Sequence, residues 1–121
     1  MGDRVLMQVV GKNEFSPVLY GHWSGESSPQ VCERIRARMH GREKDVPFTA
    51  ARLVQELIGD GREGNLGFGI WNAEAELTEK DSHGDAGIII VDVTENVMRF
   101  RCMGGYLKVS DTTGLPYMPE A

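Results

Sequence analysis

The stretch GIIIVDV at residues 87–93 constrains the fold most strongly, because it is apolar on both faces of an extended chain. Alternate side chains of a β-strand point to opposite faces of the sheet. One face would therefore carry Ile88 and Ile90, and the other Ile89, Val91 and Val93. Such a strand needs cover on both sides. If helices cover one face alone, we expect a partner or a second copy of the chain to cover part of the other.

Further strands are predicted where short apolar runs are bounded by turn residues. They fall at about residues 4–10, 18–23, 65–72, 97–103 and 106–110. The first two strands are predicted to form a hairpin with a long loop. A second hairpin is predicted where residues 94–96 connect the strand at 87–93 to the strand at 97–103. The stretch between residues 73 and 85 has no convincing period and is expected to form an exposed loop.

Two helices are predicted in the middle of the chain. Ser28 followed by Pro29 is typical of a helix N-terminus, with proline at the first helical position. The first helix then carries one apolar stripe, made of Val31, Cys32, Ile35 and Met39. The second helix runs from about Pro47 to Ile58, and its expected inward face is Phe48, Ala51, Val54, Leu57 and Ile58.

The order of these elements, ββ-αα-βββ with or without one more strand at the end, predicts an α+β fold. Consecutive strands joined by short turns pair antiparallel, and two helices grouped together suit a two-layer sandwich. We therefore expect a mostly antiparallel sheet of about five or six strands, with both helices on one face. The 121 residues are expected to form one domain, 1–121, with an irregular tail from about residue 110.

Composition and charge limit the binding partners and the cellular locations that we expect for this protein. A formal net charge of −5 disfavours bulk electrostatic binding to nucleic acid or to an anionic membrane. No run approaches the ~20 apolar residues of a membrane span, and the start MGDRVLMQVV lacks the pattern of a signal peptide. Cys32 and Cys102 are isolated, so we expect reduced thiols and a cytoplasmic location.

Several motif matches fail on their context. GDGREG at residues 59–64 matches G-x-G-x-x-G, but a helix precedes it and a strand follows, the reverse of a dinucleotide-binding loop. Ser24 has the wrong glycine spacing for a nucleophile elbow. Residues 81–85 alternate Asp, His and Asp, but Ala86 stands where a calcium loop needs glycine. The histidines and cysteines never fall into paired zinc spacings. We expect no cofactor, no metal and no catalytic residues.

His22 and Trp23 end the second predicted strand and leave two interpretations open. Strand alternation puts Trp23 with Leu19, and His22 with Tyr20. The favoured interpretation buries Trp23 under the first helix and leaves His22 on the second face of the sheet. The alternative is a small enzyme or ligand-binding site centred on His22. Such a site would need a carboxylate, for example Asp92 or Glu95, to orient the imidazole ring.

The second face of the sheet is the expected binding surface. In VMRFRCM, residues 97–103, alternation sends Met98, Phe100 and Cys102 inward and the two arginines outward. After the Gly104-Gly105 turn, Tyr106 and Lys108 share one side. The candidate binding residues are therefore Tyr20, His22, Arg99, Arg101, Tyr106 and Lys108.

The sequence between about residues 17 and 93 resembles a family of small uncharacterised proteins found in phages, prophages and some larger viruses. A strand end of the type Tyr-x-His-Trp-x-Gly is met here by Tyr20, His22, Trp23 and Gly25. The resemblance continues in the second helix and around the third strand, at Ala50, Ala51, Arg52, Leu53, Gly64, Asn65, Gly67 and Gly69. The family has no established activity, so the resemblance implies a phage or prophage context and no mechanism.

The sequence favours a small accessory domain that acts through a protein partner or as a homodimer. No recognised catalytic constellation is present, which makes an enzyme the less favoured class. The enzyme or ligand-binding alternative rests on His22. A third class, single-stranded nucleic-acid binding, needs exposed aromatic side chains among basic residues and is disfavoured by the acidic charge.

Overall fold

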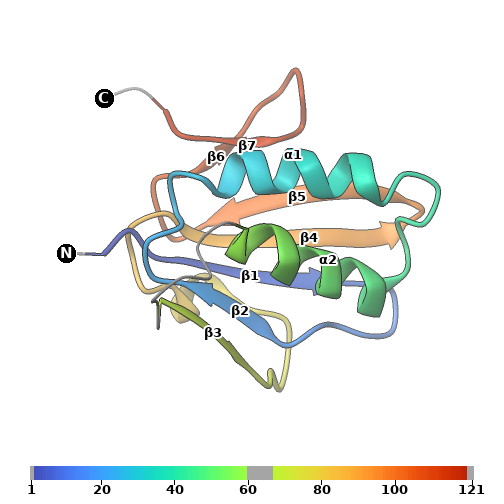
Figure 1. The fold of residues 1–121 in the computed structure, drawn as a ribbon, viewed down its shortest axis with the longest axis horizontal. Helices are drawn as coiled ribbons and strands as arrows, with labels where there is room; N and C mark the ends of the chain where they lie inside the picture. The colour runs from blue at the N-terminus through green and yellow to red at the C-terminus, as the bar shows by residue number, and fades with distance from the viewer. Residues whose placement is uncertain (1, 60–66, 120–121) are drawn as a thin grey trace.

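A computed structural model describes residues 2–59 and 67–119, and it shows an α+β sandwich (Figure 1). The main sheet contains β1 (Val5–Val10), β2 (Val18–Gly21), β3 (Phe68–Trp71), β4 (Gly87–Glu95) and β5 (Val97–Met103). Helices α1 (Ser28–Arg38) and α2 (Val46–Ile58) both lie on one face of it. The predicted fold class is confirmed. Apart from Gly59, the GDGREG stretch lies outside the described residues.

The sheet has the strand order β3-β2-β1-β4-β5. Neighbouring strands pair antiparallel except β1 and β4, which are parallel and run in register from Val5 opposite Gly87 to Val10 opposite Asp92. The starts of β1 and β4 therefore meet at one end of the sheet, where β2 and β5 finish. That end carries the loops described below.

Helix α1 presents the expected stripe to the sheet, since Val31, Cys32, Ile35 and Met39 are all buried. Pro29 stands in its first turn, and the buried Ser28 hydroxyl donates a hydrogen bond to the carbonyl oxygen of Gly25 at 2.6 Å.

The predicted inward face of α2 is correct in part, because Leu57 is buried and Val54 packs against the core, whereas Phe48 and Ala51 are exposed. The side chain of Asp45 caps the helix by accepting a hydrogen bond from the Phe48 N–H at 3.2 Å. The buried positions of the helix are Val46, Thr49, Leu53 and Leu57. Phe48 is exposed, and the guanidinium groups of Arg42 and Arg52 lie over its ring at 4.6 and 5.6 Å from the centroid.

Both faces of β4 are buried, as its sequence requires. Ile89, Val91 and Val93 join the core beneath the helices. Ile88 and Ile90 form a second cluster on the opposite face, together with Leu6, Val10 and Val18. The alternation predicted for β5 is confirmed, because Met98, Phe100 and Cys102 all pack in the core under the helices.

The chain itself covers the apolar cluster on the second face, so the burial of that cluster requires no partner. Between β3 and β4 it crosses this face and forms a short 3₁₀ turn, η1 (Glu79–Asp81). Ala73 and Leu77 from this connection pack on the second cluster. The buried side chain of Gln8 holds it in place, accepting a hydrogen bond from the Leu77 N–H at 2.8 Å and donating one to the Ala75 carbonyl oxygen at 3.3 Å.

The last predicted strand does not join the main sheet. Instead β6 (Lys108–Val109) pairs with β7 (Pro116–Tyr117) in a separate two-stranded sheet next to β5 and α1 (Figure 1). Gly105 explains the departure, because its backbone packs so closely on that of Ala86 and Gly87 that an added Cβ would lie 2.3 Å from both. The chain therefore crosses the start of β4 instead of turning back along β5.

In the described part of the chain, no helix is long and apolar enough to cross a membrane.

Candidate functional site

Tyr20 and His22 lie together on the second face of the sheet. The Tyr20 hydroxyl is 2.7 Å from Nδ1 of His22. Two residues outside the predicted set complete the group, because the rings of Trp71 and His83 lie 5.8 and 5.6 Å from that of Tyr20. Trp71 and His83 stack on each other at an interplanar angle of 19°. We call Tyr20, His22, Trp71 and His83 the aromatic cluster.

Trp23 is 63% exposed, so the expectation that it packs under the first helix is wrong. The strand ends at Gly21, and the alternation therefore stops before Trp23. The chain instead curls around Asp3, whose N–H donates to the His22 carbonyl oxygen at 2.8 Å and whose carbonyl oxygen accepts from the Gly25 N–H at 2.8 Å. The indole ring stands edge-on to the His22 ring at 4.6 Å.

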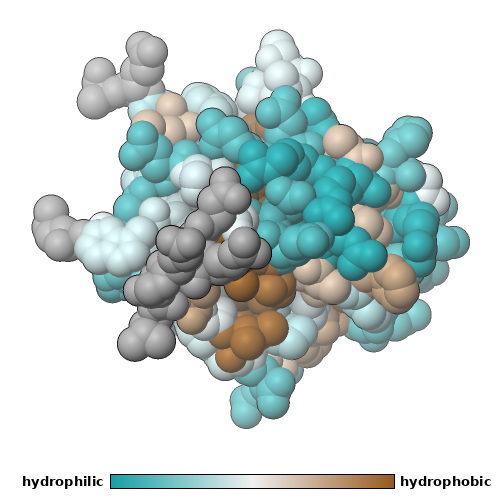
Figure 2. All heavy atoms as spheres, in the orientation of Figure 1, coloured by the Kyte–Doolittle hydropathy of each residue, from teal (hydrophilic) through white to brown (hydrophobic). Residues whose placement is uncertain are grey.

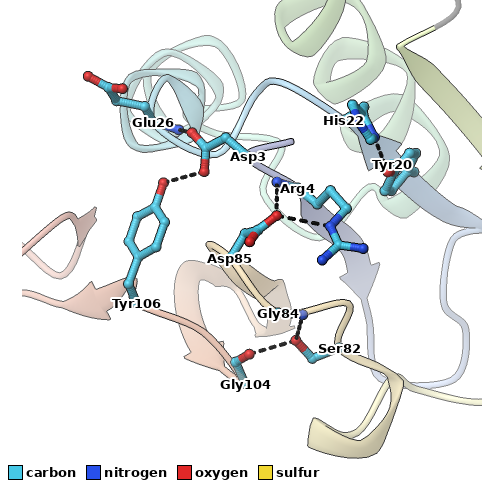
Figure 3. A network of polar contacts seen from close by, with 10 residues as sticks. All are labelled: Asp3, Arg4, Tyr20, His22, Glu26, Ser82, Gly84, Asp85, Gly104 and Tyr106. Atoms are coloured by element: carbon cyan, nitrogen blue, oxygen red, sulfur yellow. Dashed lines mark hydrogen bonds and ion pairs between the residues drawn. The ribbon is translucent and has the colours of Figure 1, made fainter. Parts of the chain in front are cut away.

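A polar network ties the loops at this end of the sheet together (Figure 3). The Arg4 side chain donates to Asp85 at 2.9 Å, and this hydrogen bond holds the pKa of the Asp85 carboxyl below its ordinary value. The Tyr106 hydroxyl donates to Asp3 at 2.6 Å. Burial, followed by that hydrogen bond, raises the pKa of Tyr106. Tyr106 thus fastens the chain after β5 to the N-terminal segment, away from Tyr20 and His22 in Figure 3.

The remaining predicted residues lie elsewhere. Arg101 is on β5, where its side chain donates to Glu76 at 3.0 Å and lies 3.3 Å from an oxygen of Asp92. Arg99 lies 3.6 Å from Glu95 on the same hairpin. Lys108 is exposed in the small β6–β7 sheet. Tyr20 and His22 on one side of the sheet touch each other, whereas β1 and β4 separate them from Arg99 and Arg101 on β5.

The carboxylates that a His22-centred site would use are at the other end of the sheet. Asp92 lies opposite Val10 at the end of β1, whereas His22 follows the residue that lies opposite Val5. The Asp92 carboxylate accepts hydrogen bonds from the backbone and side chain of Thr94. The His22 ring instead forms a hydrogen bond with the Tyr20 hydroxyl. Within residues 2–59 and 67–119, no group of three or more His, Cys, Asp or Glu side chains is arranged to hold a metal.

Strand β3 is at the edge of the sheet and carries apolar side chains on both faces. On the helix face, Phe68 and Ile70 line a groove of about 170 Å³ with residues of α2. The other lining residues are Leu19, Tyr20, Val54, Leu57, Ile58 and Gly69. Ile70 is 59% exposed. Figure 2 shows strongly hydrophobic atoms gathered in the region where Figure 1 draws β3 and α2.

On the opposite face of the same strand, Trp71 is 43% exposed at the rim of the aromatic cluster. Trp23 lies next to the start of β3, since a Cβ added to Gly67 would be 3.3 Å from its ring. The edge is therefore flanked by an aliphatic groove on one side and by aromatic rings on the other.

The backbone of β3 has one side turned away from the sheet. The His22 N–H donates to the Gly67 carbonyl oxygen at 2.7 Å, and the pairing of β2 with β3 continues from there without a register shift. In an antiparallel ladder, the residues whose N–H and C=O point at the neighbouring strand alternate. The N–H and C=O groups of Phe68 and Ile70 consequently point away from β2. We call this side of the strand, with the groove and Trp71, the β3 edge.

Comparisons with known proteins found no matching family model, no matching curated protein and no matching solved structure. The geometry of the β3 edge therefore carries the functional argument.

Proposed function

We propose that this chain is a protein-interaction domain that docks an extended segment along the β3 edge. The observation that carries the proposal is that Ile70 and Trp71, 59% and 43% exposed, project from opposite faces of a strand whose alternate N–H and C=O groups point away from the sheet. Edge strands usually carry charges, proline or a bulge that discourage pairing. Residues 68–71, Phe-Gly-Ile-Trp, contain no charge and no proline.

Binding by strand addition would use both the outward backbone groups and the apolar side chains of the β3 edge. The outward N–H and C=O groups supply main-chain hydrogen bonds, and side chains of the added strand alternate between the two faces. A cavity of about 150 Å³ accommodates a molecule the size of benzene. The groove of about 170 Å³ between β3 and α2 is thus suited to one aliphatic or aromatic side chain. The next side chain of the added strand would lie against Trp71.

The other two functional classes, single-stranded nucleic-acid binding and an enzyme centred on His22, have less support. A nucleic-acid strand would need aromatic and basic side chains on one surface, but Trp71 lies at one edge of the sheet and Arg99 and Arg101 lie on the strand at the other. A His22-centred enzyme lacks both carboxylates that its sequence suggested.

The biological role and the cellular location are also part of the proposal. A phage or prophage accessory role rests on the sequence resemblance alone. The reducing cytoplasm is favoured because both thiols, Cys32 and Cys102, are free and packed against the core.

The test uses peptides selected from a random displayed library against the wild-type protein. Ile70→Pro removes an N–H that points away from β2, and proline is tolerated at such positions of edge strands. We expect the selected peptides to bind this variant at least about tenfold more weakly. Val97→Lys changes an exposed apolar residue on the opposite edge, β5, and should leave binding unchanged.

Thermal melting checks that each variant is folded, and Ile70→Lys provides a second substitution that leaves the backbone intact. Peptides that bind all variants alike, or a selection that yields no peptide, would overturn the proposal.

A further inference from the structure

Resting on the proposed function, we propose that the segment docked along the β3 edge is β3 of a second copy of this chain. The two strands would pair antiparallel about a two-fold axis and join the two five-stranded sheets into one continuous sheet. The outward backbone groups impose one register on such a pair, and that register brings complementary side chains together.

The register follows from which residues face outward. Only Phe68 and Ile70 of β3 turn their N–H and C=O groups away from β2. Two antiparallel copies can use both residues only if Phe68 of one lies opposite Ile70 of the other, each pair exchanging two hydrogen bonds. Gly69 then lies opposite Gly69 of the second copy, on the two-fold axis.

On the helix face this register matches apolar side chains. Ile70 of each copy lies beside Phe68 of the other, at the mouth of the groove lined by Leu57 and Ile58. Ile70 is 59% exposed in the single chain, so pairing would bury apolar surface that is in water. Two such contacts form, one on each side of the axis.

On the other face the same register places Trp71 of each copy opposite Gly67 of the other. The Trp23 ring already lies beside Gly67, where an added Cβ would be 3.3 Å from it. Trp71 of the second copy would therefore meet the exposed Trp23 ring over the small Gly67, and aromatic pairs of this kind are stabilising. The order Gly-Phe-Gly-Ile-Trp at residues 67–71 is thus complementary to itself.

Charge also permits self-pairing. A two-fold axis brings like residues close together, and residues 67–71 carry no charge that would be repelled. Each chain as a whole has a formal net charge of −5, which opposes association at long range. Salt screens that repulsion, so the dimer should tighten as ionic strength rises.

The experiment measures the mass in solution by sedimentation velocity and light scattering, from low micromolar to millimolar concentration. We expect the wild-type chain to approach twice its 13.4 kDa as concentration increases. Ile70→Pro removes two hydrogen bonds per dimer and should weaken association by roughly a hundredfold. The matched control, Val97→Lys on β5, should associate like the wild type.

A cross-link tests the register itself. Residues that lie opposite each other without exchanging hydrogen bonds are about 4.5 Å apart between Cα atoms, within the range that a disulfide spans. A Cβ at Gly69 would meet its neighbours at 3.8 Å or more, so Gly69→Cys fits. On mild oxidation it should form a covalent dimer, whereas the control Val97→Cys should not.

The outcomes separate this inference from the proposed function. A wild-type chain that stays monomeric, a dimer unaffected by Ile70→Pro and Ile70→Lys, or no Gly69→Cys cross-link would overturn pairing with a second copy. The proposed function would survive the first of these results if selected peptides still required Ile70. If the wild-type chain stays monomeric and the selected peptides do not require Ile70, both the inference and the proposed function would be overturned.

Discussion

The side-chain oxygen of Gln8 accepts a hydrogen bond from the backbone N–H of Leu77 at 2.8 Å, joining residues 69 positions apart. Gln8 is fully buried in the otherwise apolar strand β1. Its amide nitrogen donates to the carbonyl oxygens of Ser16 at 3.1 Å and Ala75 at 3.3 Å. One polar residue therefore fastens the connection that covers the second face of the sheet.

Replacing Gln8 with leucine should destabilise the protein by about 2–4 kcal/mol, because the buried Ser16 carbonyl and the partly buried backbone groups of Leu77 and Ala75 lose their partner. Urea denaturation would measure the loss. Limited proteolysis should also cut residues 72–85 faster than in the wild type. Gln30→Leu, on the exposed side of α1, is the control. Equal stability of the Gln8 variant and the wild type would contradict the role given to this side chain.

The two thiols should react slowly in the folded protein. Cys32 is fully buried and burial raises its pKa well above the ordinary value. Burial raises the pKa of Cys102 to about 11. Because the thiolate is the reactive form, maleimide should label neither group appreciably near neutral pH and both rapidly in denaturant. Fast native labelling of Cys32 would mean that the inward face of α1 has been misassigned.

Arg99 and Arg101 should differ in their effect on stability, although both point outward from β5. Arg101 lies between the carboxylates of Glu76 and Asp92, so Arg101→Glu would gather three negative charges. Arg99 pairs with Glu95 alone at an exposed position. We expect Arg99→Glu to change the free energy of unfolding by less than about 0.5 kcal/mol and Arg101→Glu to lower it by more than that. Equal effects in chemical denaturation would show that the pairs around Arg101 contribute nothing.

Glu56 should give the protein a small acid sensitivity. It accepts hydrogen bonds from Arg34 at 2.6 Å and Arg38 at 2.7 Å, and these lower its pKa from the ordinary 4.5. A pKa lowered by folding stabilises the protein above the unfolded value, and the benefit is lost as pH falls through the folded value. Glu56→Gln should therefore be less stable than the wild type near neutral pH, by up to about 1 kcal/mol.

That difference should shrink in acid, as pH falls below 4.5 and through the lowered pKa of the folded wild-type carboxyl. Urea denaturation at neutral and at acidic pH measures it. A difference that does not change with pH would show that the ion pairs have no part in the stability.

The sequence correctly predicted the features that depend on the spacing of apolar residues along a single helix or strand. The stripe of α1 and the alternation in β5 are correct, because the spacing of apolar residues directly determines which of them face the core. The face of α2 was missed in part because its buried face includes Thr49, which is polar, and Val46, which precedes the predicted start of the helix. Trp23 was missed because its strand ends two residues earlier, where the chain turns around Asp3.

The cover of the second face and the β3 edge depend on contacts between distant segments. The connection after β3 has no apolar period, and its one signal in the sequence is a glutamine within an apolar strand. The strand order is also invisible to periodicity, so nothing marked Phe68–Trp71 as an edge. A run of four residues with two aromatic rings and no charge was the available hint.

Amide hydrogen exchange at Ile70 tests the central claim most directly. In dilute wild-type protein the N–H of Ile70 should exchange rapidly, since it points away from β2, whereas the N–H of Trp71 should be protected by pairing with β2. When the concentration is raised, or a selected peptide is added, protection should appear at Phe68 and Ile70 and not at Val97 on the opposite edge. Exchange at Ile70 that stays fast under both conditions would contradict docking along the β3 edge.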